Sequence, residues 1–566
     1  MGTLFSSLDI GRAGLNTAQI QLDVVGHNIA SSNKIGFSRQ RANVATRIPL
    51  ERTYGFLGRG PFVSGVERLR NEFLDISYRD QVSSLGNADI QTAFYSRIED
   101  LFQEPGENGF SENLNVFFDS LNDFANNVED IPTRVATITE AQSLATSLRE
   151  YASDLEELRT SANEDVRGIV PEINAISQQI ADLNYAIKNL EASGNEANDL
   201  RDDRDVLLDD LSRLVDIAYR ERDDGQIDVL LGGEELVNGN RIHLLETTPD
   251  ASINPDRPDF LRVQFAATGE EVQIFDGELA GAIQQRDGIL QDLVERNDTL
   301  AAALIEELNA LHSQGNGLEN IAIPLSSSNA VTDPTLALDS AGLPFTVNDG
   351  SVDLVLYDAS NNVVETVTIP VTAAATSLND IATAINGSAN ATASVTDGIL
   401  TITPNAGNSF TFTNDTAGAL PALGLNGLFT GTNARDIRVS GHLLDNAALL
   451  SSGSSLNVLE TGDNTLALEL AALRNRPVLS NNTETINDYF ESTVVRLGTN
   501  AGANLDQRDV QLAVVQDLEL RRQEISGVNL DEEVTSLIQI QKAFDASARI
   551  ITVTDRMLDT LINIVR

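Results

Sequence analysis

The sequence lacks cysteine and tryptophan and contains few positively charged residues. Without cysteine, the chain cannot form a disulfide framework, use a thiolate nucleophile or bind zinc through thiolates. The chain has 84 acidic and 38 basic residues, which gives a net charge of −46. Because nucleic acids and anionic lipids repel such a chain, this charge argues against binding to either. It favours a subunit that stays soluble before it assembles.

Long apolar runs are also missing. The sequence contains no stretch of about 18 apolar residues, so we expect no membrane-spanning helix. The first residues carry Asp9 and have no basic residue before Arg12, unlike a secretory signal peptide. If the protein is exported, we therefore expect a route that does not use a cleaved signal.

Motifs for catalysis or metal binding are absent as well. The four histidines have no second histidine or cysteine at ligand spacing, so we interpret them as surface or partly buried residues: His27, His243, His312 and His442. No nucleophile elbow, phosphate-binding loop or H-E-x-x-H motif occurs. The charged run from Arg201 to Asp205 is interpreted as a solvated helix face with opposite charges three and four residues apart. We therefore predict no catalytic, cofactor-binding or metal-binding residues and no cofactor.

Both ends of the chain carry heptad patterns. At the N-terminal end, apolar or small residues alternate spacings of four and three, at Leu4, Leu8, Gly11, Leu15, Ala18, Leu22, Val25 and Ile29. At the C-terminal end, one row repeats every seven residues, at Leu530, Leu537, Phe544, Ile551, Leu558 and Val565. Val534, Ala548 and Ile562 are predicted to form the second row, which Gln541 and Asp555 interrupt.

Two such patterns at opposite ends of the chain favour pairing with each other as a coiled coil. The alternative is two amphipathic helices lying separately on a globular core. We expect packing rather than catalysis from these residues. The predicted assembly seam consists of Leu8, Leu15, Leu22, Ile29, Leu530, Leu537, Phe544, Ile551, Leu558 and Val565.

The residues between about 87 and 215 are predicted to be helical. One apolar face runs through Ile138, Ala141, Ala145, Leu148, Ala152 and Leu155, and a second through Ile173, Ile176, Ile180, Leu183, Ile187 and Leu190. Pro171 should break or kink the helix between them, and Gly194 should end it.

Strand patterns follow. Ile227 to Leu231, Val263 to Phe265 and Val272 to Ile274 alternate as strands do, before a helix from about Gly281 to His312. From about 321 to 439 the composition shifts to Thr, Ala, Asn and Gly. There Asp397 and Gly398 predict a hairpin turn, and Ser377 with Asp380 resembles a capping box.

The predicted fold is therefore a multidomain, mainly α chain. It has paired N- and C-terminal coil helices, a long helical bundle domain and an inserted β-rich outer domain. The predicted divisions are 1–80 (N-terminal coil helix and extended segment), 81–220 (helical domain), 221–280 (β-rich segment), 281–320 (returning helix), 321–440 (inserted β-rich domain), 441–528 (helical return) and 529–566 (C-terminal coil helix).

The ends also resemble a known family. The segment Leu22 to Gln40, with Asn28-Ile29-Ala30 and Gly36-Phe37, is similar to the N-terminal signature of flagellar rod, hook and hook-associated proteins. His27 and Ser31 stand where that family usually has asparagine. Ser38-Arg39-Gln40 and the segment Ser526 to Glu533 look like the hook-associated branch, and residues 198–216 resemble its helical domain.

The resemblance implies a structural subunit at the hook–filament junction of the bacterial flagellum. It implies secretion by flagellar type III export, and a ring of copies of the chain at the distal end of the hook. The implied partners are other copies of the chain, the hook protein, hook-associated protein 3 and an export chaperone at the C-terminal helix. Neither nucleic acid nor a membrane is implied.

Two other interpretations stay open. A hook or distal-rod subunit would share the same terminal signatures, although the long helical region argues against it. A secreted hydrolase with flagellar-type ends would need a site in the β-rich insert. That insert has no histidine between Val331 and Ser440 and no nucleophile motif.

Overall fold

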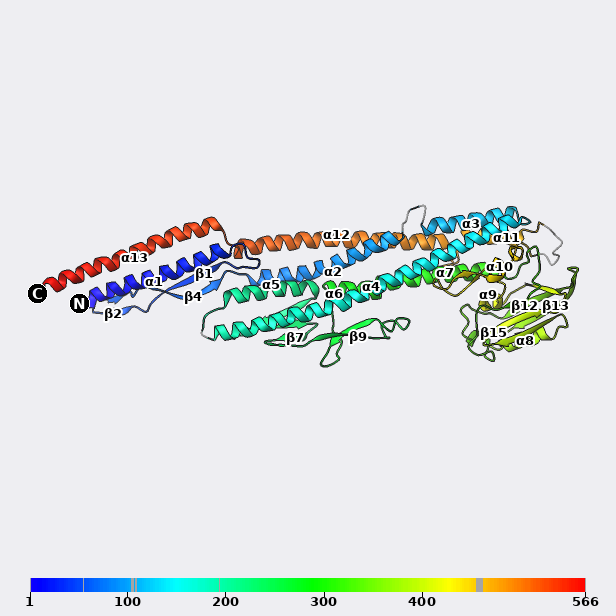
Figure 1. The fold of residues 1–566 in the computed structure, drawn as a ribbon, viewed down its shortest axis with the longest axis horizontal. Coiled ribbons are helices and arrows are strands. Elements are labelled where there is room, and N and C mark those ends of the chain that lie inside the picture. Colours follow the sequence, from blue (N-terminus) through cyan, green and yellow to red (C-terminus); the bar gives the residue numbers. More distant parts are fainter. Residues whose placement is uncertain are drawn as a thin grey trace. The chain divides into compact units, whose positions relative to one another are not determined.

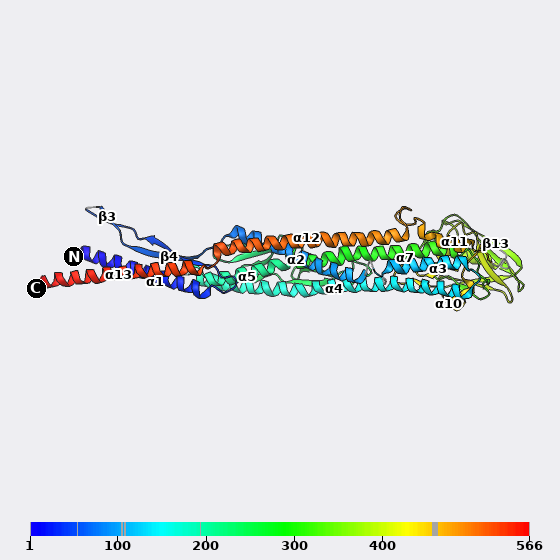
Figure 2. The ribbon, with the colours of Figure 1, turned by 90° about the horizontal axis from the view of Figure 1, so that it is seen from above.

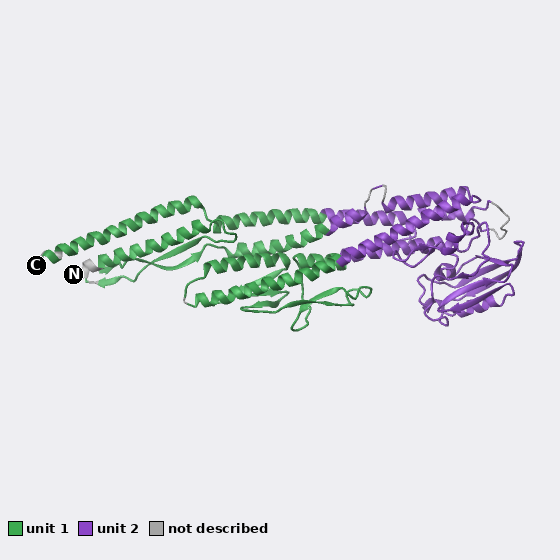
Figure 3. Cartoon of the chain, viewed as in Figure 1, with its two compact units in different colours: residues 1–93, 161–287, 503–566 green, residues 94–160, 288–502 purple. Residues whose placement is uncertain are grey.

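The computed structural model describes residues 2–53, 55–102, 106, 109–192, 194–454 and 462–564. The chain divides into two compact units (Figure 3). Unit 1 comprises Met1–Ala93, Ser161–Asp287 and Ala503–Arg566, and unit 2 comprises Phe94–Thr160 and Gly288–Gly502. Each unit is therefore assembled from segments that lie far apart in the sequence.

The two ends of the chain pair inside unit 1. Helix α1 (Gly2–Ser31) lies against helix α13 (Leu530–Ile564), as Figure 1 shows. The chain segment that follows α1 forms a hairpin. In it, β1 (Gln40–Thr46) pairs antiparallel with β4 (Pro61–Arg68), with a register shift between Asn43 and Val44. A second short pair, β2 (Leu50–Arg52) and β3 (Gly55–Leu57), closes this hairpin.

The rest of unit 1 packs two antiparallel sheets against helices. The first sheet has the order β5 (Ile217–Glu221), β6 (Ile227–Leu231), β7 (Glu234–Asn238) and β8 (Arg241–Ile242), and the second pairs β9 (Leu245–Pro249) with β10 (Leu261–Phe265). Their buried side chains join those of α5 (Asn198–Leu214) and α6 (Glu278–Gln284) in one core. The predicted strand at Val272–Ile274 is wrong. This stretch makes only an isolated bridge at Glu271, although Val272 is buried.

Three long helices contribute residues to both units, namely α2 (Glu72–Phe102), α4 (Ile131–Glu191) and α12 (Ile486–Ser526). The predicted break at Pro171 does not occur, because α4 is one helix with Pro171 inside it. Pro171, Gly168 and Arg167 are all exposed, so water can hydrate the Arg167 carbonyl that loses its helical donor. The predicted end of the helix before Gly194 is confirmed, since Gly194 has a φ of +85°.

Unit 2 contains a helical part, and the alternating apolar spacing of α4 predicted which face of that helix is buried in it. The predicted apolar face from Ile138 to Leu155 is buried throughout. The other helices of this part are α3 (Phe110–Asn126), α7 (Leu290–His312) and α11 (Thr465–Ala472). A π-helical turn, Gln285–Ile289, joins α6 to α7 without a gap, so the predicted helix from about Gly281 to His312 is present and contains one irregular turn.

The inserted β-rich domain, which includes β13 in Figure 2, lies in unit 2 (Figure 3). Its two three-stranded antiparallel sheets have the orders β13 (Val363–Val371), β12 (Gly350–Tyr357), β16 (Ser409–Thr413) and β11 (Leu325–Ser326), β15 (Ile399–Pro404), β14 (Ala391–Thr396). The shorter elements are α8 (Leu378–Asn386), α9 (Ala419–Leu423), β17 (Phe429–Thr430), β18 (Arg438–Val439) and α10 (Gly441–Asp445), with 3₁₀ turns at Leu338–Ser340, Ala447–Leu449 and Leu473–Asn475.

Two local predictions in this domain are confirmed. Ser377 and Asp380 form a complete capping box at the start of α8. Asp397 and Gly398, with φ values of 51° and 76°, form the turn between β14 and β15. The predicted fold class, a mainly helical chain with paired ends and an inserted β-rich domain, is also confirmed.

Candidate assembly site

The first feature of the site is the close approach of α1 and α13. The pair is antiparallel, since Gly11 lies beside Ile551 and Asn28 lies beside Glu533. A Cβ atom on Gly11 would lie 2.9 Å from Ile551 Cγ1. Small residues on α1 therefore allow the two helices to approach more closely than larger side chains would permit.

The predicted seam residues divide into two environments. On α1, Leu8, Leu15, Leu22 and Ile29 are half-buried, whereas Gly11, Ala18 and Val25 between them are buried. On α13, Leu537, Phe544, Ile551 and Leu558 are half-buried. Leu530 is 50% exposed, and Val565 lies outside the described residues.

The second row on α13 differs from the predicted one. Its inward residues are Glu533, Ile540, Ser547 and Thr554, whereas Val534 and Ile562 are exposed. A seven-residue repeat allows a second row either three or four residues after the first. The predicted row is the more apolar of the two, but of its apolar members only Ala548 is half-buried, whereas Glu533 of the other row is buried against partners on α1 and Arg39.

Glu533 shows how a carboxylate is accommodated in the helix pair. Its side chain is only 2% exposed. Arg39 Nε donates to Glu533 Oε1 at 2.7 Å, and Asn28 Nδ2 donates to Glu533 Oε2 at 3.2 Å. Asn28 also exchanges two hydrogen bonds with the backbone of Gln40, so one asparagine joins α1, β1 and α13.

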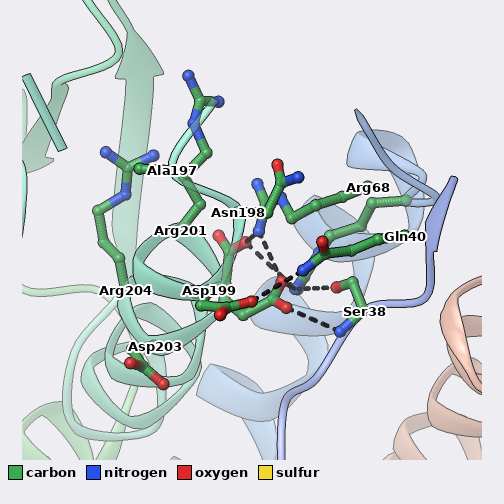
Figure 4. Close-up of polar contacts among 12 residues, drawn as sticks. Ser38, Gln40, Arg68, Ala197, Asn198, Asp199, Arg201, Asp203 and Arg204 are labelled. Atoms are coloured by element: carbon green, nitrogen blue, oxygen red, sulfur yellow. Dashed lines mark hydrogen bonds and ion pairs between the residues drawn. The ribbon is translucent and has the colours of Figure 1, made fainter. Parts of the chain in front are cut away.

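The second feature is a buried charge cluster on α5. Asp202, only 1% exposed, accepts a hydrogen bond from the Ser38 backbone N–H at 2.8 Å and pairs with Arg68 Nη1 at 2.8 Å. Figure 4 labels these two partners, Ser38 and Arg68. Arg68 Nη1 also lies 2.7 Å from Asp205 Oδ2. The interpretation of residues 201–205 as a solvated helix face is therefore wrong, because the segments that follow α1 cover Asp202 and Asp205.

The pKa values of these two carboxyl groups shift in opposite directions. Burial raises the pKa of Asp202, which the Ser38 N–H and Arg68 only partly oppose. Burial also acts to raise the pKa of Asp205, but the guanidinium groups of Arg70, Arg68 and Arg79 outweigh it and hold that pKa well below its usual range. The cluster thus keeps Asp205 ionised inside the protein.

The cluster extends to two further helices of unit 1. Arg79 of α2 pairs with Asp209 at 2.7 Å, and Arg522 of α12 pairs with Asp209 at 2.8 Å. Asp75 accepts from Arg70 at 2.8 Å and from Arg522 at 2.9 Å. Residues from β4, α2, α5 and α12 therefore meet in one ion-pair network beside the paired ends.

Sequence reasoning missed this network, although a signal was available. Between residues 34 and 70 the chain carries two acids, Glu51 and Glu67, and eight basic residues, Lys34, Arg39, Arg41, Arg47, Arg52, Arg59, Arg68 and Arg70. In so acidic a chain, such a concentration of positive charge predicts an acidic surface elsewhere that receives it.

Among the histidines, His312 contradicts its prediction. It is fully buried rather than partly exposed. Its Nδ1 lies 2.8 Å from the Asn426 carbonyl oxygen, and its Nε2 lies 3.1 Å from the Ser451 backbone N–H. Burial lowers the pKa of His312 to about 3, so the ring is neutral near pH 7, with Nδ1 donating and Nε2 accepting.

Within the described residues, no group of three or more His, Cys, Asp or Glu side chains is arranged to hold a metal ion. No helix in the same part of the chain combines the length and apolar character needed to cross a membrane.

Comparison with known proteins matches two parts of the chain to family models. Residues 95–323 match the family model described as Flagellar hook-associated protein FlgK helical domain, and residues 521–564 match Flagellar basal body rod FlgEFG protein C-terminal. Flagellar hook-associated protein 1 of Salmonella typhimurium is 28% identical, with 99% of this chain and 100% of that protein covered. The protein of the same name from Bacillus subtilis is 26% identical, with 100% and 99% covered.

A solved structure of the flagellar hook junction protein FlgK from Burkholderia pseudomallei is 19% identical, with a TM-score of 0.49, 79% of this chain and 100% of that chain covered. Paired chain ends, together with the match of the C-terminal helix, define the class of flagellar axial proteins. The helical-domain match and the full-length relatives both carry the name of one flagellar protein. Along nearly its whole length the chain is similar to flagellar hook-associated protein 1.

Proposed function

We propose that this chain is a structural, non-enzymatic subunit of the bacterial flagellum that joins the hook to the filament. The observation that carries the proposal is the end-to-end relation to hook-associated protein 1, which covers nearly all of both chains. The match of residues 95–323 to that protein's helical domain favours the junction over a hook or rod subunit. We place the protein outside the cell, on the flagellum at the distal end of the hook.

The paired terminal helices supply surfaces for assembly. Apart from the residues that face α1, α13 exposes the large apolar residues Leu530, Val534, Ile538, Val553, Met557 and Ile562. The described part of α12 in unit 1 exposes Leu505, Val510, Val514, Leu520 and Ile525. Apolar rows of this kind are buried by neighbouring helices in stable assemblies, at about 25 cal/mol per Å² of apolar area.

We further propose that the neighbours are other copies of this chain in a ring, the hook protein below it and hook-associated protein 3 above it. We propose type III export as the route, with a chaperone that covers α13 before assembly. The exposed apolar rows support this part, because an isolated chain that carries them is prone to unwanted association.

Deletion of the gene, with electron microscopy of the cells and an assay of flagellin in the medium, tests the position. Hooks without filaments, together with shed flagellin, would support the junction. Loss of the hooks themselves would move the protein to the hook or rod. Immunogold labelling separates the two further, since a junction subunit labels one band and a hook subunit labels the whole hook.

A further inference from the structure

The β1–β4 hairpin carries a tip that stays exposed among the described residues of the chain. At this arm tip, defined here as Arg47, Ile48, Phe56 and Arg59, Ile48 is 84% exposed and Phe56 is 75% exposed. Both arginines are exposed, and among the described residues no ion pair engages either of them. Isolated exposed apolar residues are common, but two beside two unpaired cations in an acidic chain indicate a contact surface.

The base of the arm is held in place, so the tip has a defined position on unit 1. Gly60, with a φ of +85°, approaches α1 closely, and a Cβ atom there would lie 3.0 Å from Ala13 Cβ. The arm strands pair from Gln40 with Arg68 to Thr46 with Pro61. The tip therefore extends from an arm base that lies against Ile10 and Ala13 of α1.

A cleft of about 1090 Å³ lies at the other end of the terminal helix pair, also within unit 1. This linker cleft is formed by residues 32–39, by Val206 and Asp209 of α5, and by residues 519–532 around the connection from α12 to α13. Its apolar side chains include Ile35, which is 86% exposed, and Leu530.

The charges of the linker cleft complement those of the arm tip. Its four basic residues are engaged, because Lys34, Arg39, Arg70 and Arg522 each pair with carboxylates of the same chain. Glu524 and Asp531 are exposed, and no ion pair in the described residues engages either of them. The cleft thus offers two unpaired acids beside apolar surface, opposite in charge to the tip.

One chain cannot bring these two surfaces together. About 20 residues of α1 separate Ala13, beside the arm base, from Ser32 at the cleft, which corresponds to about 30 Å of helix. We propose that the arm tip of one copy docks in the linker cleft of a second copy of this chain. This inference rests on the proposed function, and it names the contact that would link neighbouring subunits.

Such a contact is heterologous, because each copy presents a tip at one end and a cleft at the other. Repeated head-to-tail contacts of this kind produce rings or helical arrays rather than closed pairs. The tip is smaller than the roughly 800 Å² per partner that a stable complex needs, so we expect the contact to persist only within the assembled flagellum.

The absence of cysteine allows a direct test by site-directed cross-linking. Ile48→Cys and Gln523→Cys are introduced together into the full chain, expressed in the deletion strain, and hook–basal bodies are purified and oxidised. Docking predicts dimers and higher oligomers that a reductant converts back to monomers. The matched control combines Ile48→Cys with Tyr185→Cys, an exposed residue of α4, and should give at least tenfold less dimer.

Charge variants test the chemistry of the contact in the same background. Arg47→Glu with Arg59→Glu should lower the dimer yield at least fivefold, whereas Arg47→Lys with Arg59→Lys should retain it. Equal yields from the two would overturn the electrostatic part of the inference.

The outcomes separate the inference from the function on which it rests. Immunoblotting before oxidation shows whether the cysteine-free parent is present in hook–basal bodies, and its absence there would overturn the proposed function and the docking together. If the chain is present, cross-linking no stronger at position 523 than at position 185 overturns the docking alone. A band that joins position 48 to a different protein would assign the tip to that protein instead.

Discussion

Removal of the Asp202 carboxylate should release the arm and α1 from the body of unit 1. Asp202→Ala leaves the Ser38 N–H without its acceptor and leaves Arg68, only 13% exposed, paired with Asp205. Because Asp205 still neutralises Arg68, the main cost is the buried Ser38 N–H left without an acceptor, which is about 1–3 kcal/mol. We expect this cost to appear as local opening of residues 38–70, because Asp202 contacts both ends of that segment.

Asp203→Ala is the matched control, one residue further along the same helix. Asp203 pairs with Lys34 at 2.7 Å, but both side chains are 45% exposed. Exposed pairs contribute about 0–1 kcal/mol, so this change should be nearly neutral. The comparison therefore holds helix position and residue type constant and varies burial.

Hydrogen–deuterium exchange of the purified chain measures local opening directly. Since about 1.4 kcal/mol corresponds to a tenfold change, the amides of β1 and β4 should exchange about 10- to 100-fold faster in Asp202→Ala. The Asp203→Ala variant should stay within about fivefold of the parent chain. Equal exchange in the two variants would show that the buried cluster does not hold the arm.

Three other changes test the helix pair and the buried histidine. Gly11→Leu should accelerate amide exchange in α13 by about 10- to 100-fold, since overpacking costs about 1–3 kcal/mol, whereas Gly26→Leu, with open space around it, should not. Phe544→Asp should prevent incorporation into flagella while the β-rich domain stays folded. The control Thr552→Asp, at an exposed position of the same helix, should assemble normally. Filaments on hooks built with Phe544→Asp would contradict this prediction. His312 has a folded pKa of about 3, below its ordinary value of 6.5, so its unfolded form binds the extra proton. The stability that neutral His312 contributes is present above about pH 6.5 and is lost as the pH falls towards 3. Calorimetry at a series of pH values should therefore show a smaller loss of unfolding free energy in His312→Gln than in the parent chain.

Local patterns in the chain were sufficient for most of the secondary structure. The heptads predicted helices at both ends, Ser377 and Asp380 predicted the start of α8, and Asp397-Gly398 predicted the turn after β14. Each of these signals acts over a few residues, where hydrogen-bond geometry and side-chain spacing are fixed by the covalent chain. The resemblance of the two ends likewise pointed to flagellar axial proteins.

Burial of charge could not be predicted in the same way. Asp202 has the same residue type and neighbours as Asp203, yet one is buried and the other half-exposed. The difference comes from Arg68, which pairs with Asp202 and lies 134 residues away in the sequence. Glu533 is a second case, because its partner Asn28 on α1 lies 505 residues away. The position of Pro171 in α4 likewise depends on its surroundings. The helix tolerates this proline because the Arg167 carbonyl, which loses its helical donor, faces water.

The chain's own amino-acid order thus determines its helices, its turns and the apolar rows available for packing. Only the tertiary structure decides which row of α13 faces α1, and which acids of α5 receive the basic segment between residues 34 and 70. The physical reason is that desolvation of a charged group is favourable only when a partner group is already in place beside it. That placement depends on segments that the periodicity of one helix cannot specify.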